Sequence, residues 1–225
     1  KTIRERSLIS AGDRVLVGLS GGKDSMILLE CLSRIKKTLP FSFEVFPAHI
    51  IPVNIGYHVN TKYLEEFCTG LGFQLMLKEI RPDFERKEKS ECFVCSWHRR
   101  KALFDLTKEL DCNKLAFGHH RDDALQTFLM NMIYHGSISS MPYSLKMFEG
   151  RVNLIRPLMD LWEKDMVEIS ESRDYKAVEK TCPHEQRNKR AEISILLKEL
   201  ENKYEKAKVN MFHSLDNIYE EYLPS

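Results

Sequence analysis

The chain has 225 residues, of which 43% are hydrophobic and 30% are charged. A chain of this size and composition buries a stable core without disulfides, which excludes a disordered protein and predicts one α/β core with at most a small appendage. The formal net charge is only +1, which gives no global indication of a nucleic-acid partner. No apolar run is long enough to cross a membrane and no secretory signal is visible, so we expect a cytoplasmic protein that does not use a membrane.

Short apolar runs alternate with segments of helical periodicity through most of the chain. Strands are expected at residues 14–19, 43–50, 73–80, 114–117 and 152–155. Helices are expected at 26–39, 61–70, 98–110, 122–134 and 162–173, and 81–91 is expected to be a charge-dense loop or a ragged helix. Strands that alternate with helices form parallel sheets through right-handed crossovers. The sequence therefore predicts a Rossmann-like, doubly wound α/β fold of about five parallel strands, which binds ligands beyond the carboxyl ends of its strands.

The character of the sequence changes after Pro183. One face of a long amphipathic helix is marked there by Ile193, Leu196, Leu197, Leu200 and Tyr204. A shorter helical stretch follows as far as Tyr222. We therefore expect the main domain to span residues 1–184 and a C-terminal helical extension to span 185–225.

The segment Ser20–Ser25 reads Ser-Gly-Gly-Lys-Asp-Ser, directly follows the first expected strand and opens a helix. Its two glycines let backbone amides approach an anion, and the helix N-terminus adds a positive dipole end. It is not a Walker A loop, because Gly18 is one residue too close to Gly22-Lys23 and Asp24 replaces the required Ser or Thr. The alternative is a plain tight turn capped by Ser20 or Asp24. The pattern favours a phosphate-binding loop.

The segment Gly118–Asp123 reads Gly-His-His-Arg-Asp-Asp and lies at the carboxyl end of the fourth expected strand. Adjacent carboxylates at a strand tip are suitable ligands for Mg²⁺, which would neutralise charge on a leaving phosphate group. The sequence predicts a magnesium site made by Asp24 and Asp123. The alternative is that Asp122 caps the helix and that the two histidines are surface or supporting groups.

Two of the six cysteines form a Cys92-x-x-Cys95 pair, and Cys182 lies in a loop-like Thr-Cys-Pro-His context. The pair alone fits zinc, a redox pair or part of an iron–sulfur site. A redox pair is disfavoured because the motif lies far from the first strand-to-helix turn. Zinc bound by three cysteines and either His98 or His184 stays open. The remaining three cysteines are expected to be buried small hydrophobes, namely Cys31, Cys68 and Cys112.

Together these motifs resemble a known family. Ser20–Ser25 resembles the PP-loop of the N-type ATP pyrophosphatases, which have the adenine nucleotide alpha-hydrolase type of fold and cleave ATP between its α- and β-phosphates. The cysteine spacing is similar to that of the tRNA 2-thiocytidine synthetase family. Further resemblance to the tRNA-modifying members lies in Gly118–Thr127, Arg99-Arg100, Met141-Pro142, Arg156–Leu158 and Glu163–Asp165. One departure is that His184 and Glu185 stand where the family commonly shows a further cysteine.

The resemblance implies an enzyme, a tRNA-cytidine 2-sulfurtransferase that converts ATP to AMP and pyrophosphate. It would adenylate the C2 oxygen of an anticodon-loop cytidine and replace that oxygen with sulfur. Cys92, Cys95 and Cys182 would hold a 4Fe-4S cluster with one iron lacking a protein thiolate. The catalytic residues implied are Lys23, Asp24, Asp123 and Arg99. The ATP-binding residues implied are Gly18, Ser20, Gly21, Gly22, Lys23, Asp24, Ser25, Ala48, His49, Gly118 and Arg156.

The partners implied are tRNA and a sulfur donor, either sulfide or a persulfide carrier such as a cysteine desulfurase, and we expect a homodimer. Local charge agrees with an RNA partner. Residues 78–101 carry eight basic and five acidic groups, and residues 176–208 carry nine and six. These two basic segments contain the three cysteines, so an RNA would meet positive charge there. The alternative is that both segments are ordinary solvated surface.

Three other functions fit parts of the sequence. Uridine thiolation by a related PP-loop branch is disfavoured because that branch carries flanking zinc-finger cysteines. Lysidine synthesis gives no role to Cys92, Cys95 and Cys182. A non-enzymatic adenine-nucleotide-binding protein with structural zinc stays open.

Overall fold

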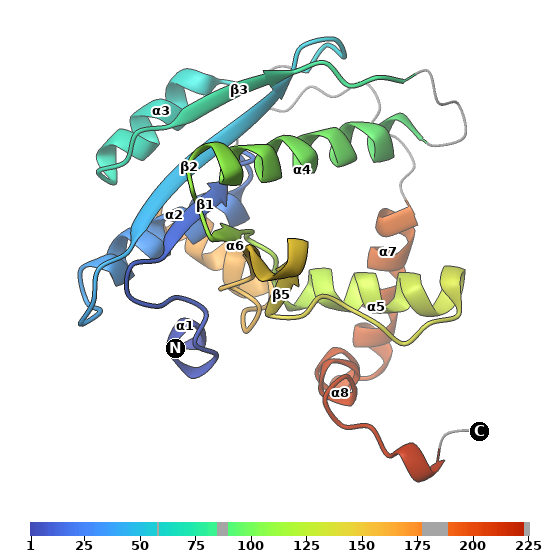
Figure 1. The fold of residues 1–225 in the computed structure, drawn as a ribbon. Coiled ribbons are helices and arrows are strands. Elements are labelled where there is room, and N and C mark those ends of the chain that lie inside the picture. Colours follow the sequence, from blue (N-terminus) through green and yellow to red (C-terminus); the bar gives the residue numbers. More distant parts are fainter. Residues whose placement is uncertain (58, 85–89, 177–188, 223–225) are drawn as a thin grey trace.

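The computed structural model describes residues 1–57, 59–84, 90–176 and 189–222. Six strands form one sheet in the order β3-β2-β1-β4-β6-β5 (Figure 1). Five are parallel, and β5 pairs antiparallel with β6 at one edge. The strands are β1 (Arg14–Gly18), β2 (Glu44–Pro52), β3 (Met76–Ile80), β4 (Lys114–Ala116), β5 (Ser144–Met147) and β6 (Val152–Ile155). The predicted doubly wound fold is confirmed.

The strand that sequence reasoning missed is β5. Its side chains are almost all exposed, so it has no apolar run to mark it. It is joined to β6 by the short 3-10 helix η1 (Phe148–Gly150), where Phe148, Glu149 and Gly150 all have positive φ. This tight connection makes an edge hairpin that extends the predicted sheet without entering its core.

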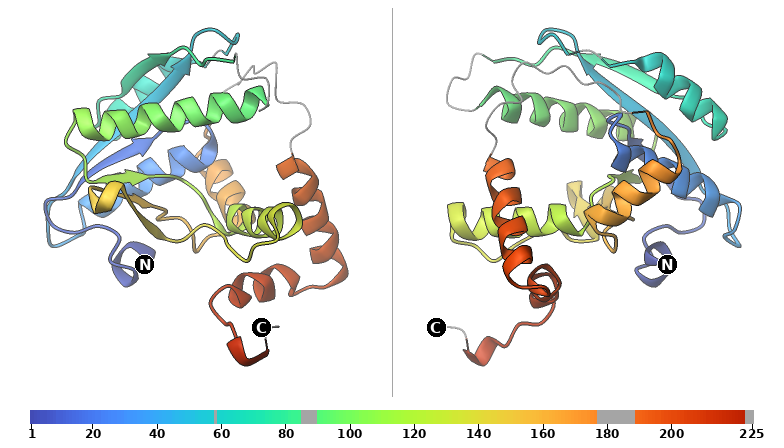
Figure 2. Two further views of the ribbon diagram at one scale, coloured as in Figure 1. Left: turned by 45° about the vertical axis from the view of Figure 1, so that its right-hand side comes forward. Right: turned by 180° about the vertical axis from the view of Figure 1, so that it is seen from behind.

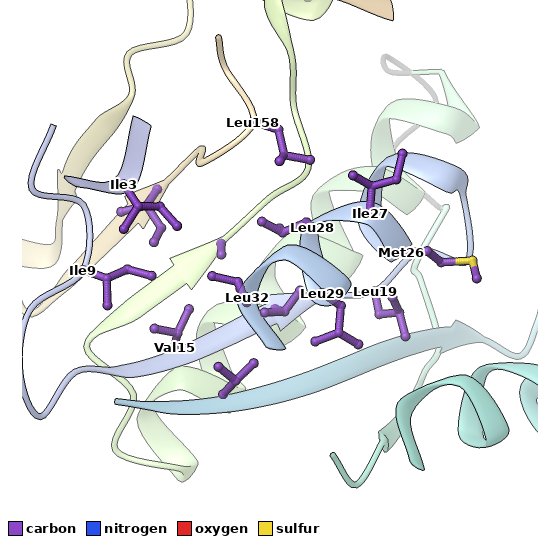
Figure 3. Packing of buried hydrophobic residues seen from close by; sticks show 14 of the residues in the cluster. Ile3, Ile9, Val15, Leu19, Met26, Ile27, Leu28, Leu29, Leu32 and Leu158 are labelled. Atoms are coloured by element: carbon purple, nitrogen blue, oxygen red, sulfur yellow. The ribbon is translucent and has the colours of Figure 1, made fainter. Parts of the chain in front are cut away.

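Helices cover both faces of the sheet. One face is covered by α2 (Lys23–Lys36), α3 (Thr61–Gly70) and α6 (Glu163–Ser172), and the short α1 (Thr2–Glu5) lies at its edge. Figure 3 shows side chains of α2 packed over β1 on this face. Val15 and Val17 point to this side, whereas Leu16 points to the opposite face, which α4 (Glu91–Glu109) covers. The period of two along β1 thus places apolar residues on both faces.

The helix α4 begins at Glu91, well before the start that was predicted at His98. Ser90 caps it, since its hydroxyl accepts the backbone N–H of Phe93 at 3.4 Å. Apolar periodicity alone could not show this start because the first turns are polar or exposed. As a result, Cys92 and Cys95 lie on a helix and not in the loop before it.

The C-terminal helices pack on the outer side of α5 (Arg121–His135), as both views in Figure 2 show. They are α7 (Lys189–Lys203) and α8 (Ala207–Ser214). The 3-10 helix η2 (Glu220–Tyr222) follows α8 and extends away from α5. The buried cluster of α7 and α8 joins Leu125 and Phe128 of α5 to Ile193 and Leu197 of α7 and Phe212 of α8. The predicted helical extension is therefore present, while its boundary at residues 184 and 185 lies outside the described residues and stays a prediction.

A buried ion pair connects this extension to α5. The Nζ of Lys208 on α8 lies 3.0 Å from Oδ1 of Asp122 and 2.6 Å from Oε2 of Glu201. Asp122 is 6% exposed, and its Oδ2 accepts the backbone N–H of Glu163 at 2.7 Å. Because a buried carboxylate is costly without partners, this contact ties α8 to the first turns of α5 and α6. Within the described residues, no helix combines the length and the apolar character needed to cross a bilayer.

We expect Lys208→Met to lower the free energy of unfolding by about 1–3 kcal/mol, because Asp122 would stay buried with its charge less well compensated. Urea denaturation at neutral pH measures the change. The matched control is Lys206→Met on the exposed N-cap of the same helix, which we expect to change stability by no more than about 0.5 kcal/mol. Equal effects of the two substitutions would contradict the role given to the buried pair.

Candidate functional site

A pocket of about 330 Å³ opens beyond the carboxyl ends of β1, β2 and β4, with α4 as one wall. The sequence-predicted residues that line it are Gly18, Ser20, Asp24, Ser25, Ala48, Arg99, Gly118 and Asp123. The remaining lining residues are Leu19, Ile50, Ser96, Arg100, Leu103, Phe117 and His119. The structure thus brings both polar motifs and the middle of α4 around a single cavity, where a doubly wound fold binds its ligands.

The phosphate loop is held in shape by its own serines. The Ser25 hydroxyl donates to the carbonyl of Gly22 at 2.8 Å and accepts the backbone N–H of Ser20 at 3.1 Å. The backbone N–H of Gly22 donates to the Ser20 hydroxyl at 3.2 Å. Gly21 has φ of +79°, which only glycine adopts without strain. The loop therefore presents the N-terminus of α2 to the pocket in a fixed conformation, which is suitable for binding phosphate.

Gly118 allows the two polar motifs to meet. A Cβ atom at this position would lie 2.5 Å from the carbonyl oxygen of Asp24, closer than any real contact. The turn after β4 therefore packs directly on the backbone of the phosphate loop. This close approach needs a glycine whatever the ligand is.

A chain of ion pairs crosses the base of the site. Lys23 Nζ lies 3.0 Å from Asp24 Oδ1 and 2.9 Å from Glu163 Oε1, and Glu163 Oε2 lies 2.9 Å from His120 Nε2. The hydrogen bond from His120, together with Lys23, lowers the pKa of Glu163 to about 2 despite partial burial. Burial would lower the pKa values of Lys23 and His120, but their carboxylate partners raise both above normal. Glu163 is therefore an ionised bridge that holds Lys23 beside the loop.

The carboxylates near the pocket differ in how many of their oxygens are free to bind a metal ion, because some of them already contact protein groups. Asp24, His120 and Glu163 bring one possible metal-ligand atom each to within 4.8 Å of one another. Burial raises the pKa of Asp24. Asp123 accepts the backbone N–H of His120 at 3.1 Å through Oδ2, so it caps α5, while its Oδ1 lies 3.6 Å from Arg190. The predicted magnesium pair of Asp24 and Asp123 thus faces the same pocket, and Glu163 adds a carboxylate that sequence reasoning did not include.

Five residues assigned to ATP from the sequence do not line the pocket. Gly21, Gly22 and Lys23 belong to the phosphate loop and the start of α2, whereas His49 and Arg156 are buried. His49 is fully buried, and its Nδ1 lies 2.6 Å from the carbonyl oxygen of Leu19, so it supports the backbone leading into the loop. Arg156 is 7% exposed and donates through Nη1 to the carbonyl of Pro142 at 2.5 Å. Of the neighbouring residues Ala48 and His49, which were both assigned to ATP binding, only Ala48 lines the pocket.

Cys92 and Cys95 are partly buried and lie one turn apart at the start of α4. Helical spacing puts them on the same side of α4 as Ser96 and Arg99, which line the pocket. Cys182 and His184 fall outside the described residues. Burial raises the pKa of the Cys68 thiol to about 12 and that of Cys112 to about 11, which makes both unreactive.

Several site residues were missed from the sequence, among them Glu163, Arg100 and Arg190. Glu163 was noted only as part of a family-like run after Arg156, and no local pattern connects it with Lys23. Arg100 was noted as part of an Arg99-Arg100 match to the family and Arg190 only as part of a basic segment, and neither was assigned to a site. Both cases depend on contacts between elements far apart in the chain.

Comparison with known proteins agrees with this geometry. The chain matches the PP-loop domain family over residues 2–200. A tRNA-cytidine(32) 2-sulfurtransferase from Verminephrobacter eiseniae is 35% identical, with 99% of this chain and 72% of the relative covered. The one from Hahella chejuensis is 33% identical, with 99% and 80% covered.

Among solved structures, the U34-tRNA thiolase NcsA from Methanococcus maripaludis, determined with its 4Fe-4S cluster, has a TM-score of 0.80. It is 23% identical, with 99% of this chain and 78% of that one covered, so it shows that the fold is shared. The phosphate loop, the PP-loop match over most of the chain and the near full-length match to the curated relatives agree. The chain belongs to the PP-loop family, within the group of the tRNA-cytidine(32) 2-sulfurtransferases.

Proposed function

We propose that this protein is an ATP-dependent tRNA sulfurtransferase that replaces the C2 oxygen of an anticodon-loop cytidine with sulfur. The observation that carries the proposal is the convergence of the phosphate loop with Ser96 and Arg99 of α4 on one pocket, on the helix face that also carries Cys92 and Cys95. The activity for which the relatives are named supports the substrate class. A base in an anticodon loop is easier to unstack into such a pocket than a base in a duplex.

ATP would bind with its adenine toward Ala48 and Ile50 and its phosphates in the loop Ser20–Ser25. The cytidine O2 attacks the α-phosphorus, and the bond to pyrophosphate breaks. Lys23, held by Glu163, and Arg99 stabilise the negative charge that grows on the leaving pyrophosphate. A hydrosulfide then adds to C2, and AMP leaves with the former C2 oxygen.

The residues of this chain fit the two groups that this chemistry uses, a 4Fe-4S cluster and Mg²⁺. Cys92 and Cys95 stand at the N-terminus of α4, where the helix dipole stabilises thiolates. With Cys182 they would hold a 4Fe-4S cluster, which supplies an iron without a protein thiolate as a binding position for sulfide. Asp24 and Asp123 would supply the carboxylate oxygens that Mg²⁺ prefers.

The wider setting is also part of the proposal. The sulfur donor would be sulfide or a persulfide carrier such as a cysteine desulfurase, and the enzyme would act as a homodimer in the cytoplasm. Lys189 and Arg190 at the start of α7, with Arg99 to Lys101 on α4, offer local positive charge to an RNA.

We expect a strain that lacks this protein to lose 2-thiocytidine from its tRNA and to regain it when the intact gene is restored. Mass spectrometry of nucleosides from digested tRNA measures this directly. Unchanged 2-thiocytidine together with a loss of 2-thiouridine or lysidine would contradict the cytidine assignment and identify the alternative substrate.

We expect Cys92→Ser to keep ATP binding but to lose both thiolation and the cluster, because one of three ligands is removed. Anaerobic purification, iron and sulfide analysis, and single-turnover thiolation of a tRNA transcript provide the measurements. Cys31→Ser is the matched control, since Cys31 lies on α2 away from the pocket and its substitution should preserve all three properties. Wild-type protein that contained zinc and no iron would contradict the assignment of the cluster.

We expect Glu163→Gln to slow pyrophosphate formation about 10- to 100-fold, because Lys23 and His120 lose the charge that orients them. The raised pKa of His120 means that its stabilising contribution is complete below the ordinary value of 6.5 and is lost as the pH rises through the folded value. In metal-free buffer, an NMR titration should show the pKa of His120 falling in the variant. Glu168→Gln on the exposed side of α6 is the control, and an unchanged His120 pKa in Glu163→Gln would refute the bridge.

A further inference from the structure

Arg99 of α4 lines the pocket and is half-buried there. In the part of the chain that the structure describes, no carboxylate pairs with Arg99 and no acceptor takes its side-chain N–H groups. The nearby cation Lys23 differs in this respect, because its Nζ already pairs with Asp24 and Glu163. Arg99 therefore keeps both its charge and its donors for a ligand in the pocket.

The guanidinium group of Arg99 contacts the ring of Tyr57, which belongs to the connection between β2 and α3. Cζ of Arg99 lies 5.3 Å from the centroid of this ring. That distance is within the range of about 6 Å over which an aromatic face attracts a cation, and the attraction grows when the contact is shielded from water. Tyr57 is only 8% exposed, so its ring is shielded in this way. The contact limits the positions that the long, flexible arginine side chain can adopt.

An aromatic ring holds a guanidinium group in a different way from a carboxylate. A carboxylate accepts the N–H groups and neutralises the charge, whereas a ring attracts the cation through its quadrupole and carries no net charge. Tyr57 therefore restrains Arg99 without using the groups that would bind an anion. A donor that is held in advance in this way spends little free energy on ordering when the ligand arrives.

Tyr57 is itself linked to the backbone that leads into the phosphate loop. Its ring is stacked with that of His49, with the two centroids 6.2 Å apart and an angle of 21° between the planes. His49 is fully buried on β2, and its Nδ1 lies 2.6 Å from the carbonyl oxygen of Leu19. Leu19 lines the pocket directly before the loop. A continuous series of contacts thus runs from the entry of the phosphate loop through His49 and Tyr57 to Arg99.

The connection between β2 and α3 is also anchored to its surroundings. Nδ2 of Asn54 donates to the carbonyl oxygen of Pro82, just after β3, at 2.8 Å. The next residue, Asp83, donates its backbone N–H to Nε2 of His98 on α4 at 3.4 Å. His98 directly precedes Arg99, so the segments after β2 and β3 both reach the same turn of α4. The Tyr57 ring is therefore a fixed support for Arg99.

We propose that Tyr57 is a positioning residue that holds the guanidinium group of Arg99 toward the phosphates of the bound nucleotide. The inference rests on the proposed function, because it takes that nucleotide to be ATP. Guanidinium groups match phosphate oxygens in pairs of parallel hydrogen bonds, which require a defined orientation. Tyr57 does not line the pocket, so it acts through Arg99 and not on the ligand.

The test compares Tyr57→Leu with Tyr57→Phe, the matched control, in the wild-type chain and in Arg99→Met. Both substitutions remove the hydroxyl, so the difference between them reports the aromatic ring alone. Calorimetry measures the affinity for ATP with Mg²⁺, and a single-turnover assay with an anticodon stem-loop RNA measures pyrophosphate release. In the wild-type chain we expect Tyr57→Leu to weaken ATP binding and to slow pyrophosphate release about three- to thirtyfold relative to Tyr57→Phe, the range expected for the loss of a cation–π contact.

In the Arg99→Met chain the two substitutions at Tyr57 should behave alike, because the ring has no cation left to hold. A merely structural role for Tyr57 would lower both measurements by the same factor whether or not Arg99 is present, and that result would overturn the inference. Equal behaviour of Tyr57→Phe and Tyr57→Leu in the wild-type chain would overturn it as well. Wild-type protein that binds ATP but releases no pyrophosphate with RNA would contradict the proposed function alone, since ATP affinity would still report the coupling between Tyr57 and Arg99.

Discussion

The bridge made by Glu163 is the interaction on which the rest of the site depends. It joins the phosphate loop through Lys23 to the turn after β4 through His120, and its own backbone N–H is held by Asp122. Asp122 is in turn paired with Lys208 of the C-terminal extension. The segments around Lys23, His120–Asp122, Glu163 and Lys208 are therefore linked through two carboxylates, those of Glu163 and Asp122. A change in any of them reaches the position of Lys23, because each link is a short contact between charged or strongly polar groups.

Two constraints on space complement this network. Gly118 lets the turn after β4 lie directly on the backbone of Asp24, and the serines of the loop hold its peptide groups in place. The loop is thus fixed by close packing against the turn at Gly118 and by the ion pair between Lys23 and Glu163. Preorganised donors of this kind contribute most to the binding of a phosphate because little energy is spent on ordering them.

The sequence predicted the core of the fold well because the central strands β1, β2 and β4 are largely buried on both faces and have apolar runs, as in residues 14–19. It missed β5, whose exposed side chains carry no such signal. It also placed the start of α4 too late, since Ser90 caps a first turn that has no apolar periodicity. The phosphate loop and the Gly118–Asp123 segment were recognisable because each is continuous in the chain. The Glu163 bridge and the Arg190–Asp123 pair were not, because tertiary packing alone assembles them.

The net charge of +1 is a second example of a property of the sequence that does not reveal what tertiary packing brings together. A global sum cannot separate charges that neutralise one another across the surface from charges that gather around a site. In the structure, Arg100 of α4 lines the pocket together with Asp123, and Arg190 of α7 pairs with that same Asp123. Basic side chains from distant segments therefore gather where the pocket meets α4 and α7, although the whole chain is almost neutral. An RNA that approaches this face would be attracted over roughly a Debye length, about 8 Å at physiological ionic strength, so the position of the arginines matters more than their number.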